Sequence, residues 1–159
     1  MTWQNRAFRF YLGARLCYFN DLYAPAVFCG QQALESLLKG TLVYWDRSFS
    51  PEAAGHSFRK MFKIFKNKVD RELPPIPEYF YAQGRYQSTS RYPSGGFLVP
   101  ATFLQDLDTA FYELVIAVPF QFNTELKRML RSRDSAKRRV LSRRNTTVRR
   151  LQRALDVRR

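Results

Sequence analysis

Apolar side chains recur at helical spacing along most of the chain. Phe8, Leu12, Leu16 and Phe19 are four, four and three residues apart, which predicts a helix over 4–20 with this stripe on its buried face. The period-of-two alternation of a half-buried strand persists nowhere in the sequence. The chain is therefore expected to begin with a helix and to contain no sheet.

Two further segments show stronger patterns. Residues 25–44 carry two adjacent apolar stripes, so this helix should have a broad apolar arc and lie centrally. Ser50 followed by Pro51 is a typical helix start. A third helix over 56–70 is predicted by spacings of three and four between its apolar residues, which are Phe58, Met61, Phe62, Phe65 and Val69.

A fourth helix is predicted over 101–118, where Leu104, Leu107, Phe111, Val115 and Val118 share one face. Pro119 should interrupt it before helical pattern resumes over 123–132. Residues 78–99 are rich in Ser, Pro and Gly and indicate a long loop, with a short helix possible over 79–85. The predicted fold is all-α, an antiparallel up-and-down bundle of four to five helices.

Charge divides the chain unevenly. The whole sequence has a formal net charge of +14. Residues 125–159 hold fourteen Lys and Arg against Glu125, Asp134 and Asp156, which is +11 and leaves +3 for residues 1–124. We therefore expect a helical domain over 1–124 and a basic, helical or partly disordered tail over 125–159. Such a charge favours an anionic partner.

The tail carries apolar residues at helical intervals among its arginines, and three interpretations stay open. It could track nucleic-acid phosphates, it could lie as an amphipathic helix on an anionic membrane or a partner helix, or it could be a solvated extension. Phosphate contact is favoured over membrane contact. The candidate nucleic-acid-binding residues are Arg138, Arg139, Arg143, Arg144, Arg149 and Arg150.

Several chemistries are not supported. Cys17 and Cys29 form no CxxC motif, and His56 is the only histidine, so no Cys/His zinc site can be assembled from this chain alone. No metal and no cofactor are expected. No apolar run reaches 18 residues and the N-terminus has no apolar signal core, so the cytoplasm is the expected compartment.

Three segments together resemble the HEPN domain family (the higher-eukaryote and prokaryote nucleotide-binding domain), over about residues 4–122. "AAGHSFRKMF" is similar to the entry of the family's third helix, and "STSRYPSG" is similar to its Arg-Tyr-Pro segment. The most specific segment is the second helix, where the matching residues are Phe28, Gln31, Gln32, Ala33, Glu35, Leu38 and Lys39.

The resemblance implies an antiparallel helical bundle that is often a homodimer. Some family members are metal-independent ribonucleases, frequently toxins of toxin–antitoxin pairs, that carry an Arg-x(4–6)-His motif. Others lack this motif, bind a nucleotide or substrate, and often act beside a small nucleotidyltransferase. The partners implied here are accordingly a nucleotide or RNA, a second copy of the chain, and a nucleotidyltransferase.

The ribonuclease motif is missing at its expected place. A motif ending at His56 requires an arginine at one of the positions occupied by Phe49, Ser50 and Pro51. A catalytic role for His56 would therefore need Arg47 or Arg91 as the cation, for example across a dimer. The favoured interpretation of His56 is structural, either heading a basic face with Lys60 and Lys63 or packing against the second helix.

Lys60 and Lys63 are candidate ligand-binding residues, and others lie around these segments. Arg91 and Tyr92 could form an anion-binding loop, or Arg91 could pair with a carboxylate such as Glu35. Glu35 and Lys39 are spaced i, i+4 in the favourable order, as a simple ion pair or as a polar patch at a cleft. The predicted function is a non-catalytic nucleotide- or RNA-binding module whose tail contacts phosphates, with a ribonuclease and a nucleotidyltransferase partner as alternatives.

Overall fold

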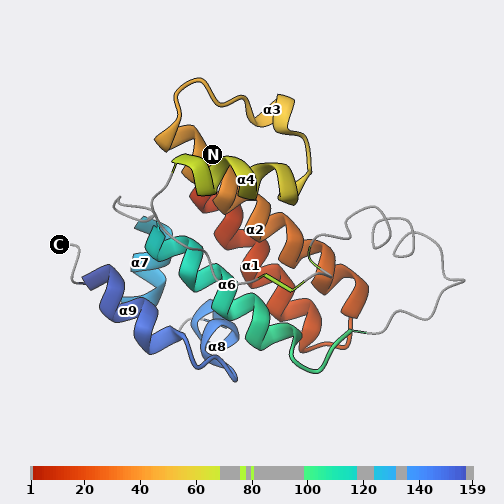
Figure 1. The fold of residues 1–159 in the computed structure, drawn as a ribbon. Helices are drawn as coiled ribbons and strands as arrows, with labels where there is room; N and C mark the ends of the chain where they lie inside the picture. Colours follow the sequence, from red (N-terminus) through yellow and green to blue (C-terminus); the bar gives the residue numbers. More distant parts are fainter. Residues whose placement is uncertain are drawn as a thin grey trace, which may run out of the picture.

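The structure, a computed structural model, describes residues 2–68, 76–77, 80, 99–117, 124–131 and 136–156. Every regular element in these ranges is a helix, which confirms the predicted all-α class. Figure 1 shows the helices packed in a bundle with the C-terminal helices along one side. They are α1 Trp3–Tyr18, α2 Tyr23–Trp45, α3 Pro51–Ala54, α4 Phe58–Lys68, α6 Phe103–Ala117, α7 Thr124–Arg131, α8 Ala136–Ser142 and α9 Val148–Asp156.

The first two helices form a long hairpin around which the others pack. Thr2 caps α1 by accepting a hydrogen bond from the Asn5 backbone N–H. Every residue of 30–42 on α2 is buried, so α2 is the central helix that its broad apolar arc predicted. A Cβ on Gly40 would lie 2.7 Å from the Trp3 Cβ, so only glycine lets α1 approach α2 this closely.

The buried face of α1 differs from the predicted stripe. Phe8 is buried, but Leu16 is 51% exposed. The inward residues are Ala7, Phe8, Tyr11, Ala14 and Arg15, so the prediction placed the face one position off. The reason is that two of these residues, Tyr11 and Arg15, carry polar groups, so a pattern of apolar side chains does not include them.

Predicted boundaries elsewhere agree closely with the structure. Ser50 caps α3 through the backbone N–H of Ala53, and Pro51 is its first residue. Phe58, Met61 and Phe65 of α4 are buried as predicted. On α6 the buried residues include the predicted Leu104, Leu107, Phe111 and Val115. Val69, Val118, Pro119 and the predicted short helix over 79–85 lie outside the described residues.

The helices beyond residue 124 share the core of the bundle. In Figure 1, α7 and α8 lie against α1, and α9 lies beside α7, with its Arg150 over the ring of Tyr112 on α6. Their buried apolar side chains belong to the same core cluster as those of α1, α2 and α6; they are Leu126, Met129, Leu130, Leu141, Val148, Leu151 and Leu155. A domain boundary at 124/125 stays a prediction, but the described part of the basic segment is a packed part of the fold.

A buried polar network holds these C-terminal helices in place. The Arg15 guanidinium is fully buried and pairs with Asp108 of α6, with one Nη1–Oδ2 distance of 2.5 Å. It also donates to the Val140 carbonyl at 3.0 Å and to the Arg143 carbonyl. Tyr11 donates to Asp108 and accepts from Asn145, so α1, α6 and the segment after α8 share one set of hydrogen bonds.

Candidate functional site

Glu35, Lys39 and His56 form one cluster between α2 and the turn that precedes α4. The buried Glu35 carboxylate lies 2.8 Å from Lys39 Nζ and 2.9 Å from His56 Nδ1. The predicted i, i+4 ion pair of Glu35 and Lys39 is therefore present, and His56 contacts the same carboxylate from outside the helix. Because a carboxylate only accepts, Nδ1 carries a proton and Nε2 is the ring nitrogen left for another partner.

His56 precedes α4 instead of lying on it. It falls in the turn between α3 and α4, and its side chain is 66% exposed. The ring contacts Glu35 of the second helix and stays at the surface, and a basic face shared with Lys60 and Lys63 stays a prediction. A helical wheel could not settle this point, since the helix begins at Phe58 and the wheel does not apply before it.

The other predicted residues near His56 are placed differently. Arg47 is exposed and lines a hollow with Trp3, Tyr44 and Trp45, and it makes no hydrogen bond or ion pair with His56. Lys60 and Lys63 are exposed on α4, and Lys60 Nζ donates to the Ala53 carbonyl at 2.9 Å. Arg91 and Tyr92 lie outside the described residues. The catalytic set therefore stays a prediction.

The six arginines predicted to bind nucleic acid separate into two groups. Arg138 donates to the Leu130 carbonyl at 2.8 Å. The guanidiniums of Arg143 and Arg150 lie 4.2 and 4.5 Å from the ring centres of Phe19 and Tyr112. Arg150 also lies 3.9 Å from Glu113. These three arginines help attach the C-terminal helices to α1, α6 and α7.

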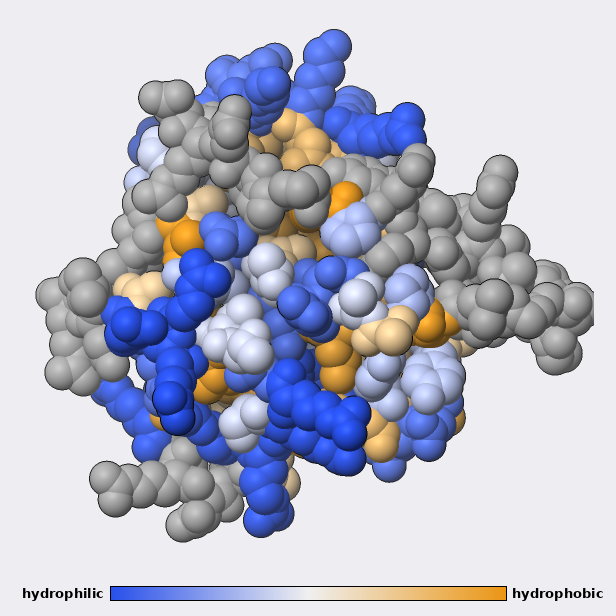
Figure 2. All heavy atoms as spheres, turned by 60° about the horizontal axis from the view of Figure 1, so that its bottom comes forward, coloured by the Kyte–Doolittle hydropathy of each residue, from blue (hydrophilic) through white to orange (hydrophobic). Residues whose placement is uncertain are grey.

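The remaining three, Arg139, Arg144 and Arg149, form what we call the arginine surface. All three are exposed, and within the described residues none makes a hydrogen bond or an ion pair through its side chain. They surround the turn between α8 and α9. Figure 2 views the bottom face of Figure 1, where α8 lies, and shows extensive hydrophilic surface there with small apolar patches.

This turn is shaped by its own side chains. Asn145 accepts hydrogen bonds from the backbone N–H and the hydroxyl of Thr147, directly before α9 begins. Arg144 has φ 51°, in the left-handed region that a non-glycine residue rarely adopts. The turn thus holds an arginine in a conformation that costs roughly 1 kcal/mol or more.

The buried Arg15–Asp108 pair was not predicted from the sequence. Its two residues are 93 positions apart, and nothing local distinguishes Arg15 from a surface arginine. Burial raises the pKa of Asp108, although Arg15 and the Tyr11 hydroxyl oppose this shift. Burial, followed by the Asp108 charge, also raises the pKa of Tyr11, so its hydroxyl stays a proton donor.

Within the described residues, no cluster of three or more His, Cys, Asp or Glu side chains could hold a metal ion. None of the helices that the structure describes combines the length and apolarity needed to cross a membrane.

The described helices form an all-α bundle in which the buried Glu35 of the central helix contacts His56 just before α4. A model of the HEPN domain matches residues 1–110, and the chain belongs to the HEPN domain family. No curated protein and no solved structure matches the chain. Membership suggests a nucleotide- or RNA-related function.

Proposed function

We propose that this protein is an RNA- or nucleotide-binding HEPN module without catalytic activity, and that its arginine surface contacts phosphates. The observation that carries this proposal is the exposure of Arg139 on α8, Arg144 in the turn and Arg149 on α9, in a segment whose helices pack on the core. Their charges are not neutralised by any acidic side chain among the described residues. An ordered surface loses less conformational entropy on binding than a flexible tail would.

The arginine surface suits the chemistry of RNA. Each guanidinium offers a planar fork of donors that matches phosphate oxygens and can also stack on an unpaired base. Every phosphate neutralised releases counterions, so log K falls with log salt by about 0.7 per contact on a single strand. Three contacts would therefore account for a slope of about 2.

The test compares the full chain with a variant in which Arg139, Arg144 and Arg149 are all changed to alanine. Binding of a fluorescein-labelled single-stranded RNA is followed by anisotropy from 50 to 300 mM salt. We expect the triple variant to bind at least about tenfold more weakly at 50 mM salt and to have a salt slope smaller by about 2.

The matched control changes Arg59, Lys63 and Lys66 on α4 to alanine, which removes the same net charge from another part of the fold. It should keep most of the affinity. If both triple variants lose affinity equally, binding depends on net charge alone and the arginine surface is not the site. If the wild-type chain does not bind RNA at all, the proposal fails.

A metal-independent ribonuclease is the second candidate, and one contact favours it. Glu35 holds Nδ1 of His56 and leaves Nε2 for another partner on a side chain that is 66% exposed, as a positioned general base requires. Our proposal expects the wild-type chain and His56→Ala to give the same background cleavage of single-stranded RNA without metal. If the wild-type chain cleaves RNA and this cleavage is lost in His56→Ala but kept in Lys63→Ala, the non-catalytic proposal is contradicted and the ribonuclease is supported.

A further inference from the structure

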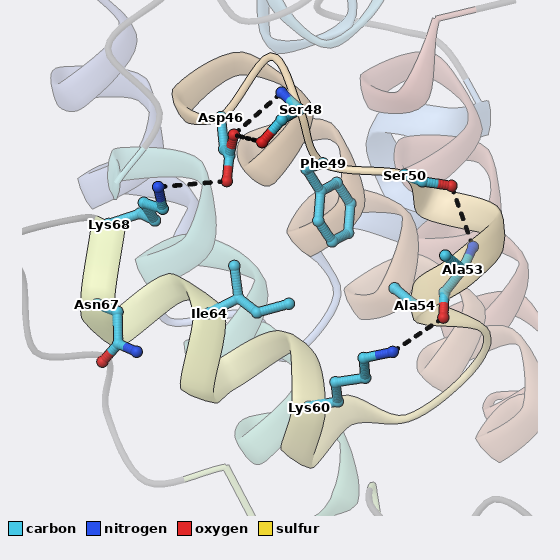
Figure 3. A pocket seen from close by; sticks show the side chains of 10 residues that line it. All are labelled: Asp46, Ser48, Phe49, Ser50, Ala53, Ala54, Lys60, Ile64, Asn67 and Lys68. Carbon is cyan, nitrogen blue, oxygen red and sulfur yellow. Dashed lines mark hydrogen bonds and ion pairs between the residues drawn. The ribbon is translucent and has the colours of Figure 1, made fainter.

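A hollow of about 390 Å³ lies between the segment that follows α2 and one side of α4. Figure 3 shows Phe49 and Ile64 facing each other at its middle, with Ala54 beside them. Phe49 and Ile64 are each partly buried and pack against the core. Its volume is within the range of small-molecule sites, which begins at about 300 Å³.

The two ends of the hollow are polar and differ in charge. Lys60 and Lys68 lie on α4 eight residues apart, which is about 12 Å along the helix axis. Figure 3 places them at opposite ends of the hollow. A ligand that fills it must therefore be elongated, apolar or flat in the middle, and polar at both ends.

The Lys60 end keeps a full positive charge. Its Nζ donates to the Ala53 carbonyl, which is neutral, and the other two N–H groups stay available. At the other end Lys68 Nζ lies 3.5 Å from Asp46 Oδ2, so a carboxylate offsets its charge. An anionic group on the ligand is thus favoured at Lys60 and disfavoured beside Asp46.

Asp46 makes the second end a hydrogen-bond acceptor. Its Oδ1 accepts from the Ser48 hydroxyl at 2.5 Å and from the Ser48 backbone N–H at 3.0 Å. The Ser48 hydroxyl and then its backbone N–H lower the pKa of Asp46, so the group is a carboxylate at neutral pH. A ligand would present N–H donors here.

These three regions define one class of ligand. We propose that the hollow binds a free nucleoside monophosphate, with its phosphate on Lys60, its base between Phe49 and Ile64, and the amino edge of the base on Asp46. An ammonium on a flexible stem is a common phosphate ligand, and a flat base suits an aromatic and aliphatic pair. This site deepens the proposed function by naming a nucleotide class, yet it shares no residue with the arginine surface.

Binding is measured by isothermal titration calorimetry of the full chain with adenosine monophosphate, adenosine and inorganic phosphate at constant ionic strength. We expect saturable one-to-one binding of adenosine monophosphate and much weaker binding of the other two. Lys60→Ala should weaken the binding about tenfold or more, as expected for loss of a charge-assisted hydrogen bond. Circular dichroism checks that the variant keeps its helices.

The matched control is Lys63→Ala, which removes another exposed lysine, about one turn further along α4, that does not line the hollow. It should leave the affinity within about twofold. Equal losses in the two variants, equal binding of inorganic phosphate, or no binding by the wild-type chain would each overturn the inference.

The outcomes also separate this inference from the proposed function. If RNA binding depends on the arginine surface while adenosine monophosphate does not bind, the hollow is excluded and the RNA-binding role stands. If adenosine monophosphate binding is lost in the triple arginine variant and kept in Lys60→Ala, the nucleotide uses the arginine surface and the hollow is again excluded.

Discussion

At the scale of single residues, the buried charges determine how this chain is held together. Arg15 is 0% exposed, and its donors are divided between one carboxylate and two backbone carbonyls. Burying a charge is costly unless it is paired and hydrogen-bonded, and here both conditions are met. The pair therefore adds little net stability by itself, but removal of either partner leaves the other buried and uncompensated.

We predict that Asp108→Asn lowers the free energy of unfolding by about 3–5 kcal/mol, because the Arg15 charge stays buried without its carboxylate. Urea unfolding followed by circular dichroism measures this loss. Glu113→Gln on the same helix is the control, since Glu113 is only loosely paired with Arg150 at 3.9 Å and should cost less than about 1 kcal/mol. Equal effects of the two substitutions would contradict the central role of the Arg15–Asp108 pair.

At the scale of elements, the C-terminal helices act as part of the bundle. Leu141, Val148, Leu151 and Leu155 each have at most 5% exposure. Burial of side chains of this size stabilises a protein by about 1.5–3 kcal/mol each. Their sum, about 6–12 kcal/mol before entropy is counted, compares with a typical total stability of about 5–15 kcal/mol.

We therefore predict that a chain ending at residue 135 is strongly destabilised and loses much of its thermal unfolding transition. The expected cause is the exposure of α1 and α6 together with loss of the acceptors of Arg15. Differential scanning calorimetry of the truncated and full chains measures the effect. If the truncated chain kept the midpoint of the full chain, the C-terminal helices would be dispensable for folding.

The truncation also bears on how RNA binding is tested. Deleting the basic segment would disturb the fold as well as remove charge, so a loss of binding could not be assigned to either cause. Substitution of Arg139, Arg144 and Arg149 removes charge and leaves the buried apolar side chains in place. Point variants are for this reason the sharper test of the arginine surface.

At the scale of the whole molecule, charge is the dominant property. A net charge of +14 raises the local concentration of anions and speeds their approach, without choosing a binding site. The structure then divides the six predicted arginines by their contacts. Arg138, Arg143 and Arg150 contact the protein itself. Arg139, Arg144 and Arg149 are exposed and make no side-chain hydrogen bond or ion pair among the described residues. Specific contact with RNA is accordingly expected from the second group.

The predictions from the sequence succeeded where the signal was local. The predicted ends of α2, α4 and α6 are close to the observed ones. The reason is that apolar spacing and capping residues such as Ser50 are signals that lie within a few residues of the helix they specify. The buried face of α1 was misplaced because Tyr11 and Arg15 are buried through partners that lie more than 90 residues away. The ion pair of Glu35 and Lys39 was foreseen, whereas its contact with His56 was one of several possibilities.

From the amino-acid sequence we could predict the all-α class, most helix boundaries, the basic C-terminal segment and the absence of an arginine at positions 49–51, since each of these depends on neighbouring residues or on composition. Three features became known from the packed helices: which of the six arginines contact the protein itself, the contact of Glu35 with His56, and the hollow between residues 46–50 and α4. Burial and pairing arise only when helices pack together. The residues next to a side chain in the sequence do not show which distant residue it will contact.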